Sequence, residues 1–577
     1  MTVTDRPGLS VAVHDLPGRK PWRMFVALFA IYTALGVWMN AGIGFIFTDS
    51  LSRVAAVSAM LLSRDPHFAA IGFVFTPLTA AVQIPMGLMG HWWPDLLRWN
   101  ITAVVMSAAF MAGAVIQVRG ISRDRGCARW VTVVLTVLFA VNPMIVMYAA
   151  SGMSEAPFLF FVLWATRRLI RWMRSDDVHD LIGAGLAFAL AYLTRYDALA
   201  PLFVAVVLVT VVSWLRFRPT AEERGEGAGP GLRLWAAALD GAVVLMPGFL
   251  AFALWSFASW LITGQAFQQF SSVYGNSSIL EQAGAGTDSP IARLAFSITE
   301  MAVLGPALPV LAVLAIIYAL RRRDTEVVVP LVLFGAILGA QTLLYVMGST
   351  FPLLRFYISI IPLCFVLVVL IAPRGTPVIT RRPGAAASRS VSTYPEQAGP
   401  SLPLVISLCL LVGSTLVTFV AMGNARIAVL EHSIASAIIP GRQNLEEQTN
   451  LRTFAAERRI ARYLDDLALP EGSVLLDTVQ SYAVVASSNN PRQFVVPSDA
   501  DFVRVLNNPA EHHVEYILSV PNTGRGVSDA VNRRYPTMYD TGAGGVGALV
   551  LEVPNDGGMD PSAWRLYRVT GERQTGR

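Results

Sequence analysis

The sequence predicts a polytopic α-helical membrane protein of about 11 transmembrane helices, with interfacial helices in the first outer loop and a small C-terminal α/β domain outside the membrane. Two observations support this fold class. The 577 residues are 54% hydrophobic and only 14% charged, with a mean hydropathy of +0.53, whereas a soluble chain of this length carries more charge. Apolar runs long enough to cross a bilayer recur up to residue 422 and then give way to short strand and helix patterns.

Eleven apolar runs, taken with their breaks, define the predicted spans. They lie near 24–46, 99–118, 129–149, 156–173, 181–194, 199–215, 234–261, 298–320, 326–347, 353–372 and 402–422. Residues 1–23 are polar and end in basic residues before a run too long for a signal peptide, so we expect a cytoplasmic tail followed by a retained span. The transmembrane domain is expected to cover residues 24–423.

The arginines predict the orientation of the spans. Alternate loops carry clusters of arginine, while the loops between them carry mostly single arginines, and basic residues favour the cytoplasmic side. The clustered residues are Arg119, Arg123, Arg125 and Arg129; Arg167, Arg168, Arg171 and Arg174; Arg216, Arg218, Arg224 and Arg233; Arg321, Arg322 and Arg323; and Arg374, Arg381, Arg382 and Arg389. We therefore expect a multi-pass plasma-membrane protein with its N-terminus inside and its C-terminal region outside. Because the arginines are spread over short loops, the net charge of +5 does not indicate nucleic-acid binding.

Four segments lie outside the predicted spans. The first outer loop, 47–98, begins with an amphipathic stretch at 50–63 and suits helices along the membrane interface. A second outer loop covers 262–297, and the cytoplasmic loop 374–400 has the Arg/Ala/Ser/Pro-rich composition of a disordered segment. The C-terminal region 424–577 is predicted to be an α/β domain. Its expected elements are a helix at 446–467 and strands at 474–476, 494–496, 516–520 and 548–553.

Asp49 is the first candidate catalytic residue. It follows the first span and opens the amphipathic stretch, which places a carboxylate at the membrane boundary. Ionisable groups at such depths are costly and are usually functional. A carboxylate there can deprotonate a hydroxyl or bind a metal ion. An aspartate is also well suited to cap a helix that starts at Ser50, and the two roles are compatible.

Glu155 is the second candidate acid. It lies in the very short outer loop between the third and fourth spans, so it is expected to face the same vestibule as Asp49. Two converging carboxylates permit either one base with one orienting group, or a site for a divalent cation such as Mg²⁺ or Mn²⁺. The alternative is that Ser154 or Glu155 only caps the fourth span, whose first turn contains Pro157.

Arg195 and Asp197 interrupt a long apolar stretch. They either pair with each other and stabilise a break in the span, or line the cavity and bind a polar substrate. The sequence favours neither interpretation.

Arg355 lies at the outer start of the tenth span, where a guanidinium can bind phosphate through two hydrogen bonds. Alternatively, it extends to ordinary lipid headgroups. Tyr357, next to Arg355, and Arg64 and His67 in the first loop complete the candidate substrate-binding residues. An interfacial histidine such as His67 is more often structural.

Several short motifs occur in an order that resembles the GT-C glycosyltransferases, the polytopic enzymes that use polyprenyl-phosphate-linked sugars. The matching features are Asp49 after the first span, Phe75 to Leu78 in the first loop, Ser154 to Pro157, the break at Thr194 to Asp197, the span from Arg355 to Pro362, and the C-terminal outer domain. The resemblance implies that Asp49 is the catalytic base or a metal-linked acid, that Glu155 is the second acid, and that Arg355 recognises the lipid phosphate. In many members the first-loop acids are paired, but here Asp49 is followed by Ser50 and Leu51, which leaves metal dependence open.

The leading functional hypothesis is therefore a glycosyltransferase of the cell envelope. It takes a sugar, mannose or arabinose being the most plausible, from a polyprenyl phosphate and joins it to a hydroxyl of a glycan, lipid or protein on the outer face. The reaction is an inverting single displacement with Asp49 as base. The alternatives are a lipid or sugar transporter or flippase, a non-catalytic scaffold with the same fold, and a glycan ligase that uses lipid-diphosphate donors.

Overall fold

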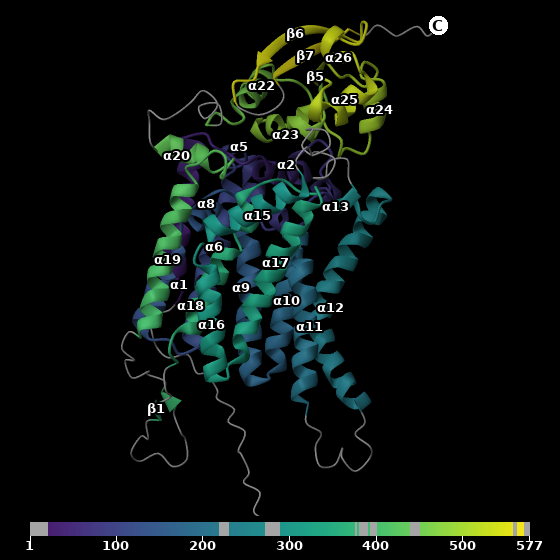
Figure 1. The fold of residues 1–577 in the computed structure, drawn as a ribbon. Coiled ribbons are helices and arrows are strands. Elements are labelled where there is room, and N and C mark those ends of the chain that lie inside the picture. Colours follow the sequence, from purple (N-terminus) through teal and green to yellow (C-terminus); the bar gives the residue numbers. More distant parts are fainter. Residues whose placement is uncertain are drawn as a thin grey trace, which may run out of the picture.

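The computed structural model describes residues 21–217, 230–271, 289–374, 378–379, 391–392, 401–438, 451–557 and 562–570. A bundle of long helices forms the larger part of the molecule, and a smaller unit of helices and strands covers one end of the bundle (Figure 1). We call this end of the bundle the tail side, and the described residues 451–570 the tail unit. The predicted cytoplasmic tail, 1–23, lies outside the described residues apart from its last three.

A helix or a bent pair of helices lies at each of the eleven predicted spans. They are α1 (Pro21–Val37), α6 (Ile101–Asp124), α7 (Arg129–Ala140) with α8 (Pro143–Ala150), α9 (Glu155–Ser175), α10 (Val178–Tyr192), α11 (Leu199–Arg216), α12 (Pro230–Thr263), α15 (Pro290–Leu304) with α16 (Leu308–Arg322), α17 (Val328–Val346), α18 (Ile360–Ile371) and α19 (Leu402–Ala421). Among the described residues, seven helices are long and apolar enough to cross a membrane, or nine if each bent pair is one span. The other two predicted spans fall on α9, whose second half carries four arginines, and on α10, which has 15 residues.

Two spans are sharply bent. The α7–α8 pair bends by 57° and the α15–α16 pair by 70°. Each break lies next to a proline, Pro143 in the first pair and Pro306 in the second, and proline removes a hydrogen bond of the helical ladder. The eighth span therefore begins at Pro290, before the predicted position 298, and changes direction at 305–307.

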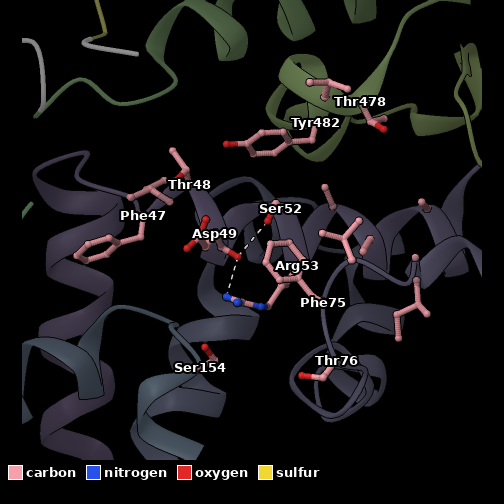
Figure 2. A pocket seen from close by; sticks show the side chains of 18 of the residues that line it. Phe47, Thr48, Asp49, Ser52, Arg53, Phe75, Thr76, Ser154, Thr478 and Tyr482 are labelled. Atoms are coloured by element: carbon pink, nitrogen blue, oxygen red, sulfur yellow. Dashed lines mark hydrogen bonds between the residues drawn. The ribbon is translucent and has the colours of Figure 1, made fainter. Parts of the chain in front are cut away.

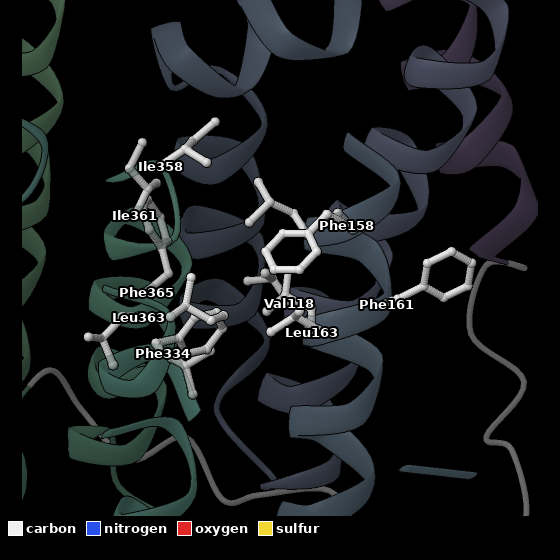
Figure 3. Packing of buried hydrophobic residues seen from close by; sticks show 14 of the residues in the cluster. Val118, Phe158, Phe161, Leu163, Phe334, Ile358, Ile361, Leu363 and Phe365 are labelled. Carbon is white, nitrogen blue, oxygen red and sulfur yellow. The ribbon is translucent and has the colours of Figure 1, made fainter. Parts of the chain in front are cut away.

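Helix α18 forms the centre of the bundle. Every residue from Ile360 to Ile371 is buried, and the helix packs against α6, α16, α17 and α19. Figure 3 shows Phe365 of α18 and Phe334 of α17 on one side of this core, with Phe158 of α9 on the other. The short helix η6 (Leu354–Tyr357) leads directly into α18, so this rigid core positions Arg355.

The first loop is a layer of short helices on the tail side. It contains α2 (Thr48–Leu62), η2 (Phe68–Ile71), α3 (Leu78–Ala81), α4 (Ile84–Gly87), η3 (Leu88–His91) and α5 (Asp95–Arg98). Leu51 and Val54 on the buried face of α2 join Ala483 and Ala486 of the tail unit in one apolar cluster. Helix α2 therefore lies between the bundle and the tail unit.

Two other predicted loops are only partly described. Of the second outer loop, 262–297, residues 262–271 and 289–297 are described and residues 272–288 are not. The described part contains α13 (Gln268–Ser271) and the start of α15. Of 374–400, the described parts are residue 374 and the strands β1 (Val378–Ile379) and β2 (Val391–Ser392), which pair antiparallel. The predicted disorder of the remaining residues lies outside the described structure. Helix α20 (His432–Ile438) follows α19.

The tail unit has a mixed five-stranded sheet in the order β4-β3-β5-β7-β6. Strands β3 (Val474–Leu475), β4 (Phe494–Val495) and β5 (Tyr516–Ser519) are parallel, and β6 (Gly547–Pro554) and β7 (Ala563–Val569) complete the sheet antiparallel. Helices α22 (Ala455–Asp466) and α23 (Thr478–Ser487) share an apolar cluster on one face, and α24 (Phe502–Asn507) and α25 (Ala530–Arg534) share one on the other. The short η7 (Pro491–Gln493), η8 (Gly524–Ser528) and α26 (Met538–Thr541) connect these elements.

The predicted helix and all four predicted strands are present in the tail unit, but β7 was not predicted. The alternation of Trp564, Leu566 and the residues between them is a strand signal that the sequence does contain. The first part of the predicted helix, 446–450, lies outside the described residues, and residues 451–454 form turns before α22 begins at Ala455.

Arg64 ties the first loop to the tail unit. Its guanidinium Nη2 lies 3.0 Å from Asp499 Oδ2, and it also pairs with Asp501. The Asp499 side chain is fully buried, while 21% of the Arg64 side chain is exposed. Burial raises the pKa of Asp499 above its usual value, although hydrogen bonds from Val496 N and Arg64 oppose the rise. The predicted substrate-binding residue Arg64 therefore has a partner within the protein.

We expect the Arg64→Met variant to lose about 3 kcal/mol of stability, because it leaves a buried carboxylate without its cation. The measurement is the melting temperature of the purified protein, together with the rate at which protease releases the tail unit. The matched control is the double variant Arg64→Met/Asp499→Asn, which removes both charges and should be less destabilised than the single variant. A single variant as stable as the wild type would contradict this role.

Candidate active site

Five of the residues selected from the sequence meet at the junction of the bundle and the first loop. Asp49 comes from α2, Glu155 from the first residue of α9, Arg195 and Asp197 from the break between α10 and α11, and Arg355 from η6. Ion pairs connect all five. They are up to 306 residues apart in the sequence, so the fold brings them together.

The start of α2 places Asp49. The helix begins at Thr48, with Phe47 as its N-cap residue, so Asp49 lies in the first helical turn and is not the N-cap that the sequence suggested. Ser50 Oγ donates a hydrogen bond of 3.0 Å to Asn100 Oδ1, and Asn100 Nδ2 donates one of 3.0 Å to Asn40. This buried network fixes α2 against the first span and orients the neighbouring carboxylate.

The Asp49 carboxylate accepts a hydrogen bond of 2.7 Å at Oδ2 from Arg355 Nη2. Burial raises the pKa of Asp49, but Arg355 and Arg53 outweigh it and hold the pKa below its usual value. With 34% of its side chain exposed, Asp49 is an accessible, ionised acceptor.

A tight turn brings Glu155 to the same place. Gly152 has a φ of +75°, and a Cβ atom added to it would collide with Ser50 Oγ of α2, so this turn requires glycine. The Glu155 side chain is 2% exposed and its Oε1 accepts a hydrogen bond of 2.8 Å from Arg195 Nη1, while its Oε2 is buried without a hydrogen-bond partner. Ser154 makes no side-chain cap to α9. Glu155 is therefore a buried counter-ion of the site.

Arg195 has two carboxylate partners. Besides Glu155, its guanidinium contacts Asp197 Oδ2 at 2.5 Å, as one of the two sequence interpretations expected. The Phe356 ring lies 5.5 Å from the Arg195 guanidinium carbon and 5.2 Å from that of Arg355. The two arginines are thus held side by side at an aromatic ring, which supports both interpretations of Arg195.

These residues lie on the wall of a cavity of about 600 Å³. Its floor is formed by Asp49, Arg195, Asp197 and Arg355, and its side by α2 and the loop around Phe75. Figure 2 shows Asp49 and Arg53 on α2, with Tyr482 and Thr478 of α23 on the opposite side. The lining is more apolar than polar, which suits an amphiphilic ligand.

The tail unit closes this cavity with one edge of its sheet. Asp477 and Thr478 follow β3, Pro497 and Ser498 follow β4, and Arg525 and Ser528 follow β5, and all six line the cavity. The three strands are parallel, so this is the edge at their carboxyl ends, where open α/β sheets bind ligands.

A second, smaller cavity of about 170 Å³ lies beyond the arginines, between α9, α11 and α17. Arg195, Asp197 and Arg355 line both cavities. The ion-pair network therefore lies at the boundary between the two spaces.

Three predicted substrate-binding residues do not line either cavity. Arg64 pairs with the tail unit, His67 Nδ1 lies 2.7 Å from the Asp65 carbonyl, and the buried Tyr357 donates a hydrogen bond of 2.7 Å to Ser297. Conversely, Arg53 lines the large cavity and was not singled out from the sequence. Its position one helical turn after Asp49 was the available signal.

The carboxylates do not fit a divalent cation. Arg355 lies between the two acids, with Nη2 2.7 Å from Asp49 and Nε 3.7 Å from Glu155. A guanidinium there supplies the positive charge and repels a metal ion. Among the residues that the structure describes, no three His, Cys, Asp or Glu side chains are arranged to bind one.

No family model matches this sequence, and no curated protein matches it either. Solved structures do match. The apo structure of ArnT from Cupriavidus metallidurans aligns over 95% of this chain and 98% of that chain, with a TM-score of 0.51 and 13% identity. The Pmt1–Pmt2 O-mannosyltransferase complex of S. cerevisiae bound to the sugar donor is 15% identical, with a TM-score of 0.32 over 43% of this chain and 34% of that chain.

AglB, the oligosaccharyltransferase of Archaeoglobus fulgidus, in complex with an inhibitory peptide and a dolichol-phosphate, is 11% identical, with a TM-score of 0.35 over 86% of this chain and 69% of that chain. This chain spans about a third of the Pmt1–Pmt2 chain that it matches. We base the fold on the near-complete match to ArnT. The chain shares the fold of ArnT over nearly its whole length, and this is the GT-C fold that its sequence predicted.

Proposed function

We propose that this chain of GT-C fold is an integral-membrane glycosyltransferase that moves a sugar from a polyprenyl phosphate to a hydroxyl acceptor. The observation that supports this most is the meeting of an ionised carboxylate, Asp49, with the guanidiniums of Arg195 and Arg355 on one cavity wall. A phosphate bound by arginines and a hydroxyl beside a carboxylate are the two partners that such a transfer needs.

The reaction is a single displacement at the anomeric carbon. The acceptor oxygen attacks this carbon, the bond to the phosphate oxygen breaks on the opposite face, and Asp49 takes the hydroxyl proton. The products are a glycoside of inverted configuration and polyprenyl phosphate. Arg355 and Arg195 offset the negative charge on the leaving phosphate.

Donor binding also prepares the base. In the structure Arg355 holds Asp49 and lowers its pKa, which makes the carboxylate a weak base. A phosphate that takes hydrogen bonds from Arg355 competes with Asp49 for the same guanidinium. When it does, the pKa of Asp49 rises and its carboxylate turns to the acceptor hydroxyl. Glu155 remains as the buried counter-ion that keeps Arg195 in place.

The acceptor enters beneath the tail unit. The sheet edge above the cavity presents Thr478, Ser498 and Ser528, with Arg525 beside them. These hydroxyls and the guanidinium suit a glycan, lipid or protein acceptor with polar groups. The arginine-rich loops at the other end of the bundle support an orientation with the site and the tail unit outside the plasma membrane. The envelope donors that we favour carry mannose or arabinose.

Metal removal should leave the reaction intact. Because an arginine lies between the two carboxylates, we expect transfer in excess EDTA to stay within about twofold of the untreated rate. The assay is initial rate with and without EDTA, and then with Mg²⁺ or Mn²⁺ restored. A loss in EDTA that either cation reverses would contradict a metal-free site.

The test of the proposed function uses purified protein in nanodiscs, a panel of labelled polyprenyl-phosphate sugars, and a cell-envelope fraction as acceptor. We expect the label of one sugar to pass from the lipid to the acceptor. Transfer only from polyprenyl diphosphates would favour a ligase. Movement of intact donor across the membrane of proteoliposomes without transfer would favour a transporter. If neither transfer nor transport is observed, the non-catalytic scaffold is the remaining alternative.

A further inference from the structure

Arg53 is a buried cation of the large cavity without a carboxylate partner. The residue is 6% exposed, and Nη1 donates a hydrogen bond of 2.9 Å to the backbone carbonyl of Asp49. The guanidinium carbon lies 4.5 Å from the centre of the Phe75 ring, and Nε is buried without a hydrogen-bond partner. Within the described residues, Arg53 forms no ion pair with an acid.

The other two arginines of the site differ in this respect. Arg195 pairs with Glu155 and Asp197, and Arg355 pairs with Asp49 and lies 3.7 Å from Glu155. These three carboxylates form ion pairs with Arg195 and Arg355 and none with Arg53, although Glu155 Oε2 has no hydrogen-bond partner. Burying a charge without a partner is costly, so a buried, unpaired guanidinium on a cavity wall indicates that an anionic ligand completes it.

The electrostatic surroundings of Arg53 agree with this. Burial lowers the pKa of Arg53, Asp49 and Glu155 raise it, and the charges of Arg355 and Arg195 lower it further. Arg53 therefore lies within the influence of both other arginines, and an anion placed among the three interacts with all of them.

We propose that Arg53 binds the phosphate of the lipid leaving group and stabilises the charge that appears when the glycosidic bond breaks. This inference rests on the proposed function. The donor is a phosphodiester with one negative charge. Arg355 can neutralise this charge once its guanidinium no longer binds Asp49. The product is a phosphomonoester, whose second pKa of about 6 gives it nearly two charges at neutral pH. Arg195 assists Arg355 but stays paired with Glu155 and Asp197, so Arg53 is the guanidinium that remains for the second charge.

A kinetic test separates this role from ordinary donor binding. We expect the Arg53→Gln variant to lower kcat by about 10²–10³-fold, as for loss of one donor to a developing oxyanion, with the KM for the donor changed by less than about threefold. The Arg53→Lys variant should recover part of kcat, because it keeps the charge but not the planar fork. Arg123→Gln, which alters an exposed arginine at the other end of α6, is the matched control.

Binding of the product gives a readout that does not depend on activity. Farnesyl phosphate serves as the probe, by calorimetry at pH 7.5 and pH 5. We expect Arg53→Gln to weaken binding at least about tenfold at pH 7.5 and less at pH 5, where the monoester carries close to one charge. An affinity of Arg53→Gln for farnesyl phosphate that equals the wild-type affinity at pH 7.5 would overturn the role of Arg53. A rise in the donor KM by the same factor as the fall in kcat would also overturn it. A wild-type protein that binds no prenyl phosphate and transfers no sugar would overturn the proposed function itself.

Discussion

The Asp49→Asn variant should transfer sugar about 10²–10⁴-fold more slowly than the wild type, because it removes the group that takes the acceptor proton. The amide has nearly the same size, and its oxygen can still accept the hydrogen bond that Arg355 donates at 2.7 Å. We therefore expect little change in donor KM. The loss of stability should be smaller than for removal of Arg355, because Arg355 keeps Glu155 at 3.7 Å. The measurement is kcat and KM for the donor, beside the thermal unfolding of the same preparation.

Asp95→Asn is the matched control for this variant. Asp95 belongs to the same loop, but its side chain is 51% exposed and pairs with Arg98 away from both cavities. Its substitution should leave transfer unchanged. Equal rates for Asp49→Asn and the wild type would remove Asp49 from the mechanism.

Replacement of Arg355 should have the second large effect, because it changes both activity and stability. In Arg355→Gln the carboxylates of Asp49 and Glu155 lose a shared cation that is itself 9% exposed. Breaking a buried pair costs about 3–5 kcal/mol, and we expect the lower end because part of the Asp49 side chain is exposed. Transfer should fall at least about 10³-fold, since the leaving phosphate loses its cation as well.

The pH dependence of Arg355→Gln has a definite sign. Arg355 is the largest of the influences that lower the pKa of Asp49, against burial, which raises it. Without Arg355 the pKa of Asp49 rises, so the ionised form is lost at a higher pH. The acid limb of the residual pH–rate profile should therefore move to higher pH than in the wild type. The double variant Arg355→Gln/Asp49→Asn should regain stability without regaining activity, and a single variant with wild-type stability and pH profile would contradict this account.

The sequence predicted the fold well because hydropathy and arginine placement are properties of local windows. Each predicted span falls on a helix, and the helix and strands expected in the tail unit are present. The bends at 141–142 and 305–307 were not predicted, because an apolar run continues through them and only the adjacent prolines mark the break. Strand β7 was missed although its alternating pattern is in the sequence.

The sequence predicted most residues of the candidate site but not the ion pairs that they form. Asp49, Glu155 and Arg355 stood out as charges at the ends of apolar runs, which is a local signal. That Arg355 holds Asp49, or that Arg64 holds Asp499 across 435 residues, depends on tertiary contacts that no local pattern contains. Arg53 was not predicted as a site residue, because its lack of a carboxylate partner becomes visible only when the neighbouring acids are placed.

The most direct test of the central claim is analysis of the products of a single turnover by the wild-type protein. Labelled polyprenyl-phosphate sugar and acceptor are mixed with excess protein in nanodiscs, and both products are quantified. We expect one polyprenyl phosphate for each sugar transferred, with the anomeric configuration of the sugar inverted. Retention of configuration would contradict a single displacement with Asp49 as base, and recovery of the intact donor from every sugar in the panel would contradict glycosyl transfer altogether.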